Sequence, residues 1–297
     1  MPLADQHQSA EYVKLLGIGD SGTGKTGSLV SLVKAGYKLR VLDFDNGLDP
    51  LVAQVRQQCP DRLANIAFIS EGLRDKFKPG PGGAMLPDGQ VRAFTKAIGL
   101  LDKWVETDAA GKVVLDYGPP RTWGADTILV LDTLTFLSDA AFNWATAMNP
   151  GAKDPRQWYK TAQDAVSHML GLLSSADFKT NVIVFAHVKY MDRPDGSVKG
   201  YPTSVGSALS PEIPAYFNSV ALYQTVVGGR RTIRTQATAL IDLKNPASFK
   251  MAPEFDLNEG LVKFFETLKG PLPPAIEKVT TPGKPFINIV TEAPTKP

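Results

Sequence analysis

Short apolar runs alternate with helical patterns along most of the chain. The runs are residues 12–18, 39–44, 66–69, 128–131 and 182–186. They are largely apolar rather than strictly alternating, so they predict strands that are buried on both faces. Such strands occur in a mainly parallel sheet with helices on each side. The predicted fold class is therefore α/β.

Two helices are predicted between these strands. The first follows Lys25, uses Leu29, Leu32 and Val33 as its apolar positions, and ends at Gly36. The second opens with Asp154 as N-cap and Pro155 as its first residue. Its apolar face consists of Trp158, Ala162, Val166, Met169 and Leu173. This face is expected to pack on the sheet.

Weaker patterns fill the rest of the chain. Residues 71–126 are turn-rich, with one helix expected over 94–105, and indicate an insertion into the core. Residues 220–227 and 230–236 flank Gly228-Gly229 and predict an antiparallel hairpin, to which residues 238–243 add a third strand. We expect a core over 11–269, an N-terminal tail over 1–10 and a proline-rich tail over 270–297.

Composition narrows the class of protein. Hydrophobic residues make up 43% of the 297 residues and charged residues 21%, as in an ordinary globular domain. No apolar run approaches the roughly 18 residues of a membrane span, and the N-terminus lacks a signal-peptide pattern. A cytoplasmic protein without a membrane partner is expected. Cys59 is the single cysteine, and the net charge of +2 does not indicate nucleic acid.

The segment between the first strand and the first helix has the pattern of a phosphate-binding loop. It fits G-x-x-x-x-G-K-[ST] with Gly19, Asp20, Ser21, Gly22, Thr23, Gly24, Lys25 and Thr26, and Gly27 follows. Glycines let backbone N–H groups approach phosphate oxygens closely. Lys25 is expected to reach the β- and γ-phosphates, and the Thr26 hydroxyl to ligate Mg²⁺. The predicted cofactors are ATP and Mg²⁺.

Polar residues at the ends of other strands complete a candidate site. Asp132 ends an apolar strand in the Walker B arrangement and is predicted to position Mg²⁺, the alternative being a helix cap. Asp43 and Asp45 end the second strand, where ligands of open α/β sheets gather. Asp45 is predicted to orient the attacking water, although DNG is also a common turn sequence. His187 follows the fifth strand and either senses the γ-phosphate or plays a structural role.

With these residues in order, roughly residues 11–250 resemble the RecA family, and the stretch TWGADTILVLDTLT resembles the phage Sak-type single-strand annealing proteins. The resemblance implies a RecA-like core and head-to-tail oligomers, as rings or filaments. It also implies that Lys244 acts on the ATP of the neighbouring subunit. RecA has Glu where this chain has Asp45, glutamine at His187, and a second basic residue at Pro246. Slow, DNA-dependent ATP hydrolysis is therefore expected.

The same resemblance implies two DNA-facing loops, one over 148–156 and one after His187. The second contains Lys189, Tyr190, Arg193, Lys199 and Tyr201. Cations that follow phosphates and aromatic rings that stack on bases suit single-stranded DNA. An ordinary surface loop is the alternative. The nucleotide state is expected to order this loop, and Arg230, Arg231 and Arg234 are weaker DNA-binding candidates.

Three function classes remain open from the sequence. The first is an ATP-dependent recombinase or annealing protein, phage-encoded and located in the host cytoplasm, with single-stranded DNA, itself and a single-strand-binding protein as partners. The second is a P-loop motor or helicase-loading ATPase, and the third is a nucleotide-gated binding module with little catalysis. Residues 286–290, FINIV, are expected to add a strand to a neighbour or to complete the chain's own sheet edge.

Overall fold

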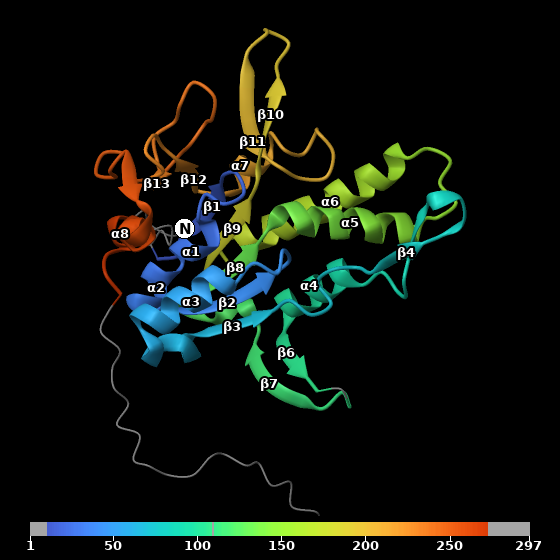
Figure 1. Cartoon of the computed structure of the whole chain (residues 1–297), viewed down its shortest axis with the longest axis horizontal. Helices are drawn as coiled ribbons and strands as arrows, with labels where there is room; N and C mark the ends of the chain where they lie inside the picture. The colour runs from blue at the N-terminus through green and yellow to red at the C-terminus, as the bar shows by residue number, and fades with distance from the viewer. Residues whose placement is uncertain (1–10, 109, 273–297) are drawn as a thin grey trace, which may run out of the picture.

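The computed structural model describes residues 11–108 and 110–272, and its centre is an eight-stranded sheet (Figure 1). The strand order is β14-β13-β12-β1-β9-β8-β2-β3. The strands are β1 (Lys14–Ile18), β2 (Lys38–Asp43), β3 (Ile66–Ile69), β8 (Gly124–Asp132), β9 (Thr180–Ala186), β12 (Ser219–Thr225), β13 (Arg231–Arg234) and β14 (Glu254–Asp256). Every pair from β12 to β3 is parallel. This confirms the α/β prediction.

Alternate side chains of each central strand enter two different cores. In β1, Leu16 joins one hydrophobic cluster and Leu15 the other, because successive strand residues point to opposite faces. One face is covered by α4 (Ala93–Asp102), α5 (Leu134–Met148), α6 (Arg156–Ser174) and α7 (Ile213–Tyr216). The other is covered by α1 (Lys25–Ser28), α2 (Val30–Lys34), α3 (Asp49–Gln58) and α8 (Leu257–Lys269). The short helix η3 (Pro60–Asn65) leads into β3.

Two small hairpins interrupt the chain between β3 and β8. They are formed by β4 (Phe77–Pro79) with β5 (Met85–Pro87), and by β6 (Trp104–Thr107) with β7 (Val113–Gly118). The turns η4 (Pro81–Gly83) and η5 (Pro120–Thr122) lie in the same segment. The 94–105 helix prediction was too long, because Lys103 adopts extended backbone and Trp104 enters a strand.

The sheet ends in antiparallel strands, as predicted, but one of these strands is not the predicted one. β12 and β13 form the expected hairpin. The third strand prediction over 238–243 was wrong, because Thr238 folds the chain into a turn in which its hydroxyl accepts from Leu240 and Ile241. The third strand is β14, which pairs with β13.

Two helix predictions also need correction. The helix after Lys25 is divided at Leu29 into α1 and α2. The helix predicted from Pro155 starts at Arg156, and Pro155 is its N-cap; the Asp154 carboxylate still accepts from the Arg156 backbone N–H at 3.0 Å. The predicted tail 1–10 and the FINIV segment lie outside the described residues. Among the described helices, none has the length and apolarity that a bilayer crossing requires.

Candidate functional site

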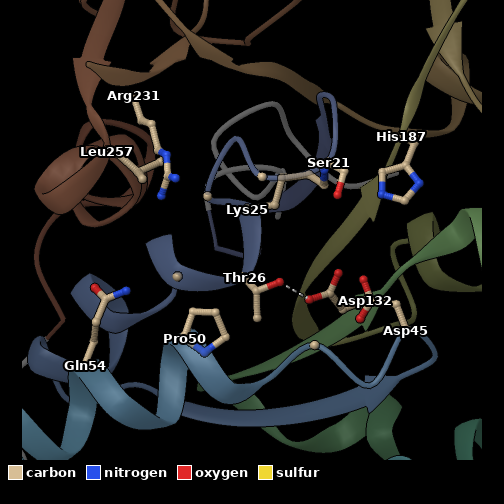
Figure 2. Close-up of a pocket in the computed structure, with 14 residues that line it drawn as sticks. Ser21, Lys25, Thr26, Asp45, Pro50, Gln54, Asp132, His187, Arg231 and Leu257 are labelled. Carbon is tan, nitrogen blue, oxygen red and sulfur yellow. Dashed lines mark hydrogen bonds between the residues drawn. The ribbon is translucent and has the colours of Figure 1, made fainter. Parts of the chain in front are cut away.

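A cavity of about 290 Å³ opens at the carboxyl ends of the central strands, where ligands of open α/β sheets bind. Figure 2 shows the side chains around it. Lys25, Thr26, Asp45, Asp132 and His187, which the sequence analysis singled out, all line this cavity. Its other lining residues are Ser21, Gly22, Gly24, Gly27, Gly47, Pro50, Gln54, Arg231 and Leu257. The fold thus gathers residues from six separate segments.

The loop between β1 and α1 needs its glycines. Gly22 and Gly24 have φ values of 78° and 92°, which L side chains rarely adopt. A Cβ on Gly24 would also collide with the Leu257 side chain, and one on Gly19 with the Tyr223 backbone oxygen. Lys25 is 7% exposed, and its Nζ donates to the backbone oxygens of Gly19 at 2.8 Å and Asp20 at 2.9 Å. Burial lowers the pKa of Lys25.

Thr26 and Asp132 meet across the floor of the cavity. The Thr26 hydroxyl donates to Asp132 Oδ2 at 2.6 Å (Figure 2). Asp132 is fully buried, and its second oxygen, Oδ1, has no hydrogen-bond partner among the described residues. Burial, followed by the charge of Asp45, raises the pKa of Asp132 to about 7. A buried carboxylate oxygen without a donor is a place where a cation is stabilised.

Two more carboxylates lie at the end of β2. Asp43 Oδ1 accepts from the Gly47 backbone N–H at 3.1 Å, and burial raises the pKa of Asp43 to about 6, with hydrogen bonding and charge from Asp45 adding to the shift. Asp45 Oδ1 is buried and accepts no hydrogen bond from any side chain or backbone group within 11–108 and 110–272. Asp43 therefore secures the turn, whereas Asp45 presents its carboxylate to the cavity.

His187 directly follows β9 and lies beside Ser21 of the P-loop (Figure 2). Its backbone N–H donates to Thr135 Oγ1 at 3.1 Å, and its ring packs edge-to-face on Phe136, with centroids 5.9 Å apart. Burial, followed by the charge of Lys25, lowers the pKa of His187. A neutral imidazole in this position offers one donor and one acceptor to the cavity.

These residues fit a magnesium nucleotide. The loop supplies backbone N–H groups and Lys25 for phosphate, while Thr26 and Asp132 supply hard oxygen ligands for Mg²⁺. No group of three or more His, Cys, Asp or Glu side chains suited to a metal occurs within 11–108 and 110–272. Mg²⁺ usually keeps waters and takes further oxygens from substrate phosphates, so two protein ligands such as Thr26 and Asp132 suffice.

A second cavity, of about 460 Å³, adjoins the first and shares Gly27, Gln54, Arg231 and Leu257 with it. Its remaining lining residues are Ser28, Gly229, Arg230, Asp256 and Asn258. No sequence pattern pointed to Gln54, Leu257 or Asn258 as site residues. Arg231 was expected as a weak DNA-binding candidate, whereas in the structure it lines the cavity at the phosphate-binding loop.

The five predicted DNA-binding residues lie on one projecting hairpin. Strands β10 (Val188–Asp192) and β11 (Val198–Pro202) follow His187 and leave the sheet (Figure 1). Lys189 and Tyr190 are exposed. By contrast, Arg193 donates to Tyr201 Oη at 2.7 Å, and Lys199 Nζ pairs with Asp242 at 2.6 Å. The contacts of Arg193 and Lys199 therefore hold the hairpin toward its tip, whereas the exposed Lys189 and Tyr190 lie close to its base.

Other predicted residues lie away from the cavity. Lys244 lines a separate cavity of about 330 Å³ with Thr235 and Asn245, and its backbone bridges to Val220. Burial lowers the pKa of Lys244. The other expected DNA-facing segment, 148–156, connects α5 to α6, and its Arg156 pairs with Asp154. Neither region lines the cavity at the phosphate-binding loop of the same chain.

Comparison with known proteins gives a family and two remote structural similarities. A family model described as "AAA domain" matches residues 11–247. The crystal structure of the RadB recombinase is 13% identical, with a TM-score of 0.41, covering 75% of this chain and 80% of that one. A type III secretion system ATPase of pathogenic bacteria is 13% identical, with a TM-score of 0.40, covering 72% and 52%. No curated protein sequence matches.

Proposed function

We propose that this RecA-like P-loop ATPase, which belongs to the AAA-domain family whose model matches residues 11–247, binds single-stranded DNA under the control of ATP. We propose further that it promotes strand annealing or homologous recombination. The observation that carries the ATPase part is the pairing of Thr26 with the otherwise unsatisfied, buried Asp132 beside Lys25. This arrangement supplies oxygen ligands for Mg²⁺ and a cationic side chain for the phosphates, as a magnesium triphosphate requires.

Each residue has a distinct role in the proposed reaction. Lys25 exchanges its two loop carbonyls for phosphate oxygens. Thr26 and Asp132 would hold Mg²⁺, which would neutralise charge on the phosphates. Asp45 orients the attacking water and accepts its proton, because its buried Oδ1 is available to a hydrogen-bond donor.

The proposed nucleoside site is the adjoining cavity of about 460 Å³. That cavity continues from the P-loop past Gly27 and Ser28, and the amides of Gln54 and Asn258 reach its walls. Amide groups can both donate to and accept from a base edge. A purine nucleoside is thus bound away from Asp45 and Asp132, with the γ-phosphate at the end occupied by Asp45 and His187.

The DNA-binding part of the proposal rests on the β10–β11 hairpin. Lys189 and Tyr190 offer an exposed cation and an exposed ring, a combination that suits a single strand. The hairpin begins immediately after His187, and the Thr203 backbone N–H at its other end donates to the His187 oxygen at 2.7 Å. A change at His187 on nucleotide binding therefore acts at both strands of the hairpin's base.

Assembly is a further component of the proposal. Lys244 lies outside its own nucleotide cavity, so it acts there only from a neighbouring subunit in a head-to-tail oligomer. A Lys244→Ala variant is expected to bind ATP normally but to hydrolyse it more slowly at protein concentrations where assembly occurs. Equal phosphate release by both proteins under those conditions would exclude this role.

The proposed function is tested by measuring single-stranded DNA binding with ATP, with ADP and without nucleotide, together with phosphate release. The wild type is expected to bind DNA in a nucleotide-dependent, salt-sensitive manner, and Lys25→Ala to lose this dependence. ATP binding without DNA affinity in any state favours a motor or helicase-loading ATPase, which directional strand displacement identifies. ATP affinity with negligible phosphate release favours a gated binding module.

A further inference from the structure

We propose that Arg231 is a phosphate-binding residue of its own subunit's nucleotide site, at the nucleoside end of the triphosphate. This inference rests on the proposed nucleotide binding and adds a residue that neither the loop motif nor the carboxylate pattern includes. Arg231 is the first residue of β13, about 200 positions after the P-loop. Its place is set by the sheet rather than by any local motif.

The pleat of β13 directs Arg231 toward the P-loop. Residues two apart in a strand share a face, so Arg231 lies on the same face as Ile233. Ile233 is buried in the cluster that α1, α2 and α8 cover. Consistently, a Cβ built on Gly24 would lie 3.4 Å from Arg231 Cδ. The arginine thus lies beside the backbone of the phosphate-binding loop.

The guanidinium of Arg231 has no protein partner among the described residues. Its two neighbours in the hairpin are engaged: Arg230 pairs with Glu254 at 3.1 Å, and Arg234 Nε donates to the Gln236 backbone oxygen at 3.0 Å. Arg231 instead lines both cavities. Figure 2 shows its side chain pointing into the space between Leu257 and Gln54. A cation left unpaired beside an anion-binding loop is poised for an anionic ligand.

The position along the cavity identifies which phosphate Arg231 contacts. In Figure 2, Asp45, Asp132 and His187 lie on one side of Thr26, and Arg231, Leu257 and Gln54 lie on the other. The carboxylates mark the γ-phosphate and the metal. Arg231 is therefore placed for the α-phosphate, at the junction with the cavity that receives the nucleoside.

This placement separates binding from turnover. A cation at the α-phosphate contacts ATP and ADP equally, so it strengthens both and leaves the chemical step at the γ-phosphate unchanged. Because Arg231 belongs to the same chain, its contribution does not require a neighbouring subunit. Lys244, by contrast, is proposed to act only in an oligomer.

The test compares Arg231→Gln with the matched control Arg234→Gln, a residue of the same hairpin that lines neither cavity, by calorimetric titration with ATP and with ADP. Arg231→Gln is expected to raise the Kd of both nucleotides by about tenfold, the range of one charge-assisted hydrogen bond. Its kcat at saturating ATP is expected to stay within about twofold, so that only KM changes. Arg231→Lys should recover part of the affinity, since it restores the charge but not the forked donors. Arg234→Gln should leave both affinities unchanged.

The outcomes separate this inference from the proposed function. An Arg231→Gln variant with wild-type affinities overturns the inference, and so does a variant that loses ATP affinity and kcat while binding ADP normally, which would place Arg231 at the γ-phosphate. A wild type that binds neither nucleotide, or whose binding survives Lys25→Ala, overturns the proposed function itself. Thermal unfolding without nucleotide checks that Arg231→Gln remains folded.

Discussion

The guanidinium of Arg74 lies over the ring of Phe136, 4.5 Å from its centroid. Arg74 Nε also donates to the backbone oxygen of Phe44, which stands between Asp43 and Asp45. Phe136 in turn packs against His187. Arg74 and Phe136 therefore connect the carboxylate segment to His187, the residue directly before the β10–β11 hairpin.

Replacing Arg74 by methionine is expected to uncouple DNA binding from the nucleotide. The variant loses a charge-assisted hydrogen bond and a cation–π contact, together worth about 2 kcal/mol of stability. ATP affinity should remain, while the ratio of DNA affinities with ATP and with ADP falls toward one. Lys96→Met is the control, because Lys96 donates to Glu71 in the same insertion but contacts neither segment. A wild-type ratio for Arg74→Met would exclude the connection.

Asp45 is predicted to matter for turnover and not for binding. Asp45→Asn keeps the size of the side chain but removes the proton acceptor, so phosphate release should fall by at least about 100-fold with ATP affinity nearly unchanged. Asp45→Glu retains the acceptor and should retain activity. Single-turnover phosphate release measures both, and an active Asp45→Asn would assign the proton transfer to another residue.

The nucleotide-free protein is predicted to lose stability as the pH rises from about 4 to about 7. The folded pKa of Asp132 is about 7 and that of Asp43 about 6, both above the unfolded value of about 3.9. The folded state therefore binds more protons than the unfolded state in this window, and this advantage disappears as both carboxyls ionise. Urea unfolding at pH 5 and pH 8 measures the loss. Asp132→Asn should reduce the difference, and an unchanged difference would contradict the assignment.

The hairpin prediction separates stacking from charge. Tyr190→Ala is expected to weaken single-stranded DNA binding by about 1–3 kcal/mol with little change in salt dependence. Lys189→Ala should lower the slope of affinity against salt by roughly 0.7, the value for one phosphate contact to a single strand. Lys160→Ala serves as the control, because Lys160 pairs with Asp164 on α6. Identical binding curves for all three variants would remove the hairpin from the DNA interface.

A packing prediction concerns Gly17 in β1. A Cβ at this position would lie 2.8 Å from both the Phe185 and Tyr223 rings, which pack edge-to-face behind the P-loop. Gly17→Ala should therefore cost about 1–3 kcal/mol of unfolding free energy. Denaturant unfolding measures it, and a neutral result would mean that the rings move apart easily.

The central sheet was predictable because its signals are local. Each buried strand is a compact apolar run, and the loop from Gly19 to Thr26 carries its pattern in eight consecutive residues. The β14 strand escaped detection because its three residues are too few to show a period. Residues 238–243 misled because their β-prone composition is overridden by the turn at Thr238.

The side of the cavity that we propose for the nucleoside was not predictable for a different reason. Gln54, Arg231 and Leu257 come from α3, β13 and α8, which meet only through the sheet order and its register. The two-residue repeat of a strand already places Arg231 on the same face as the buried Ile233. The sequence does not show which helices cover this face of β13; in the structure they are α1, α2 and α8.

The Lys25 ammonium group donates to two carbonyls of its own loop. An anion that binds Lys25 has to replace two good neutral acceptors at once. A multiply charged phosphate gains more electrostatic energy from the ammonium group than a singly charged ion such as chloride does. The two hydrogen bonds therefore favour phosphate over singly charged anions.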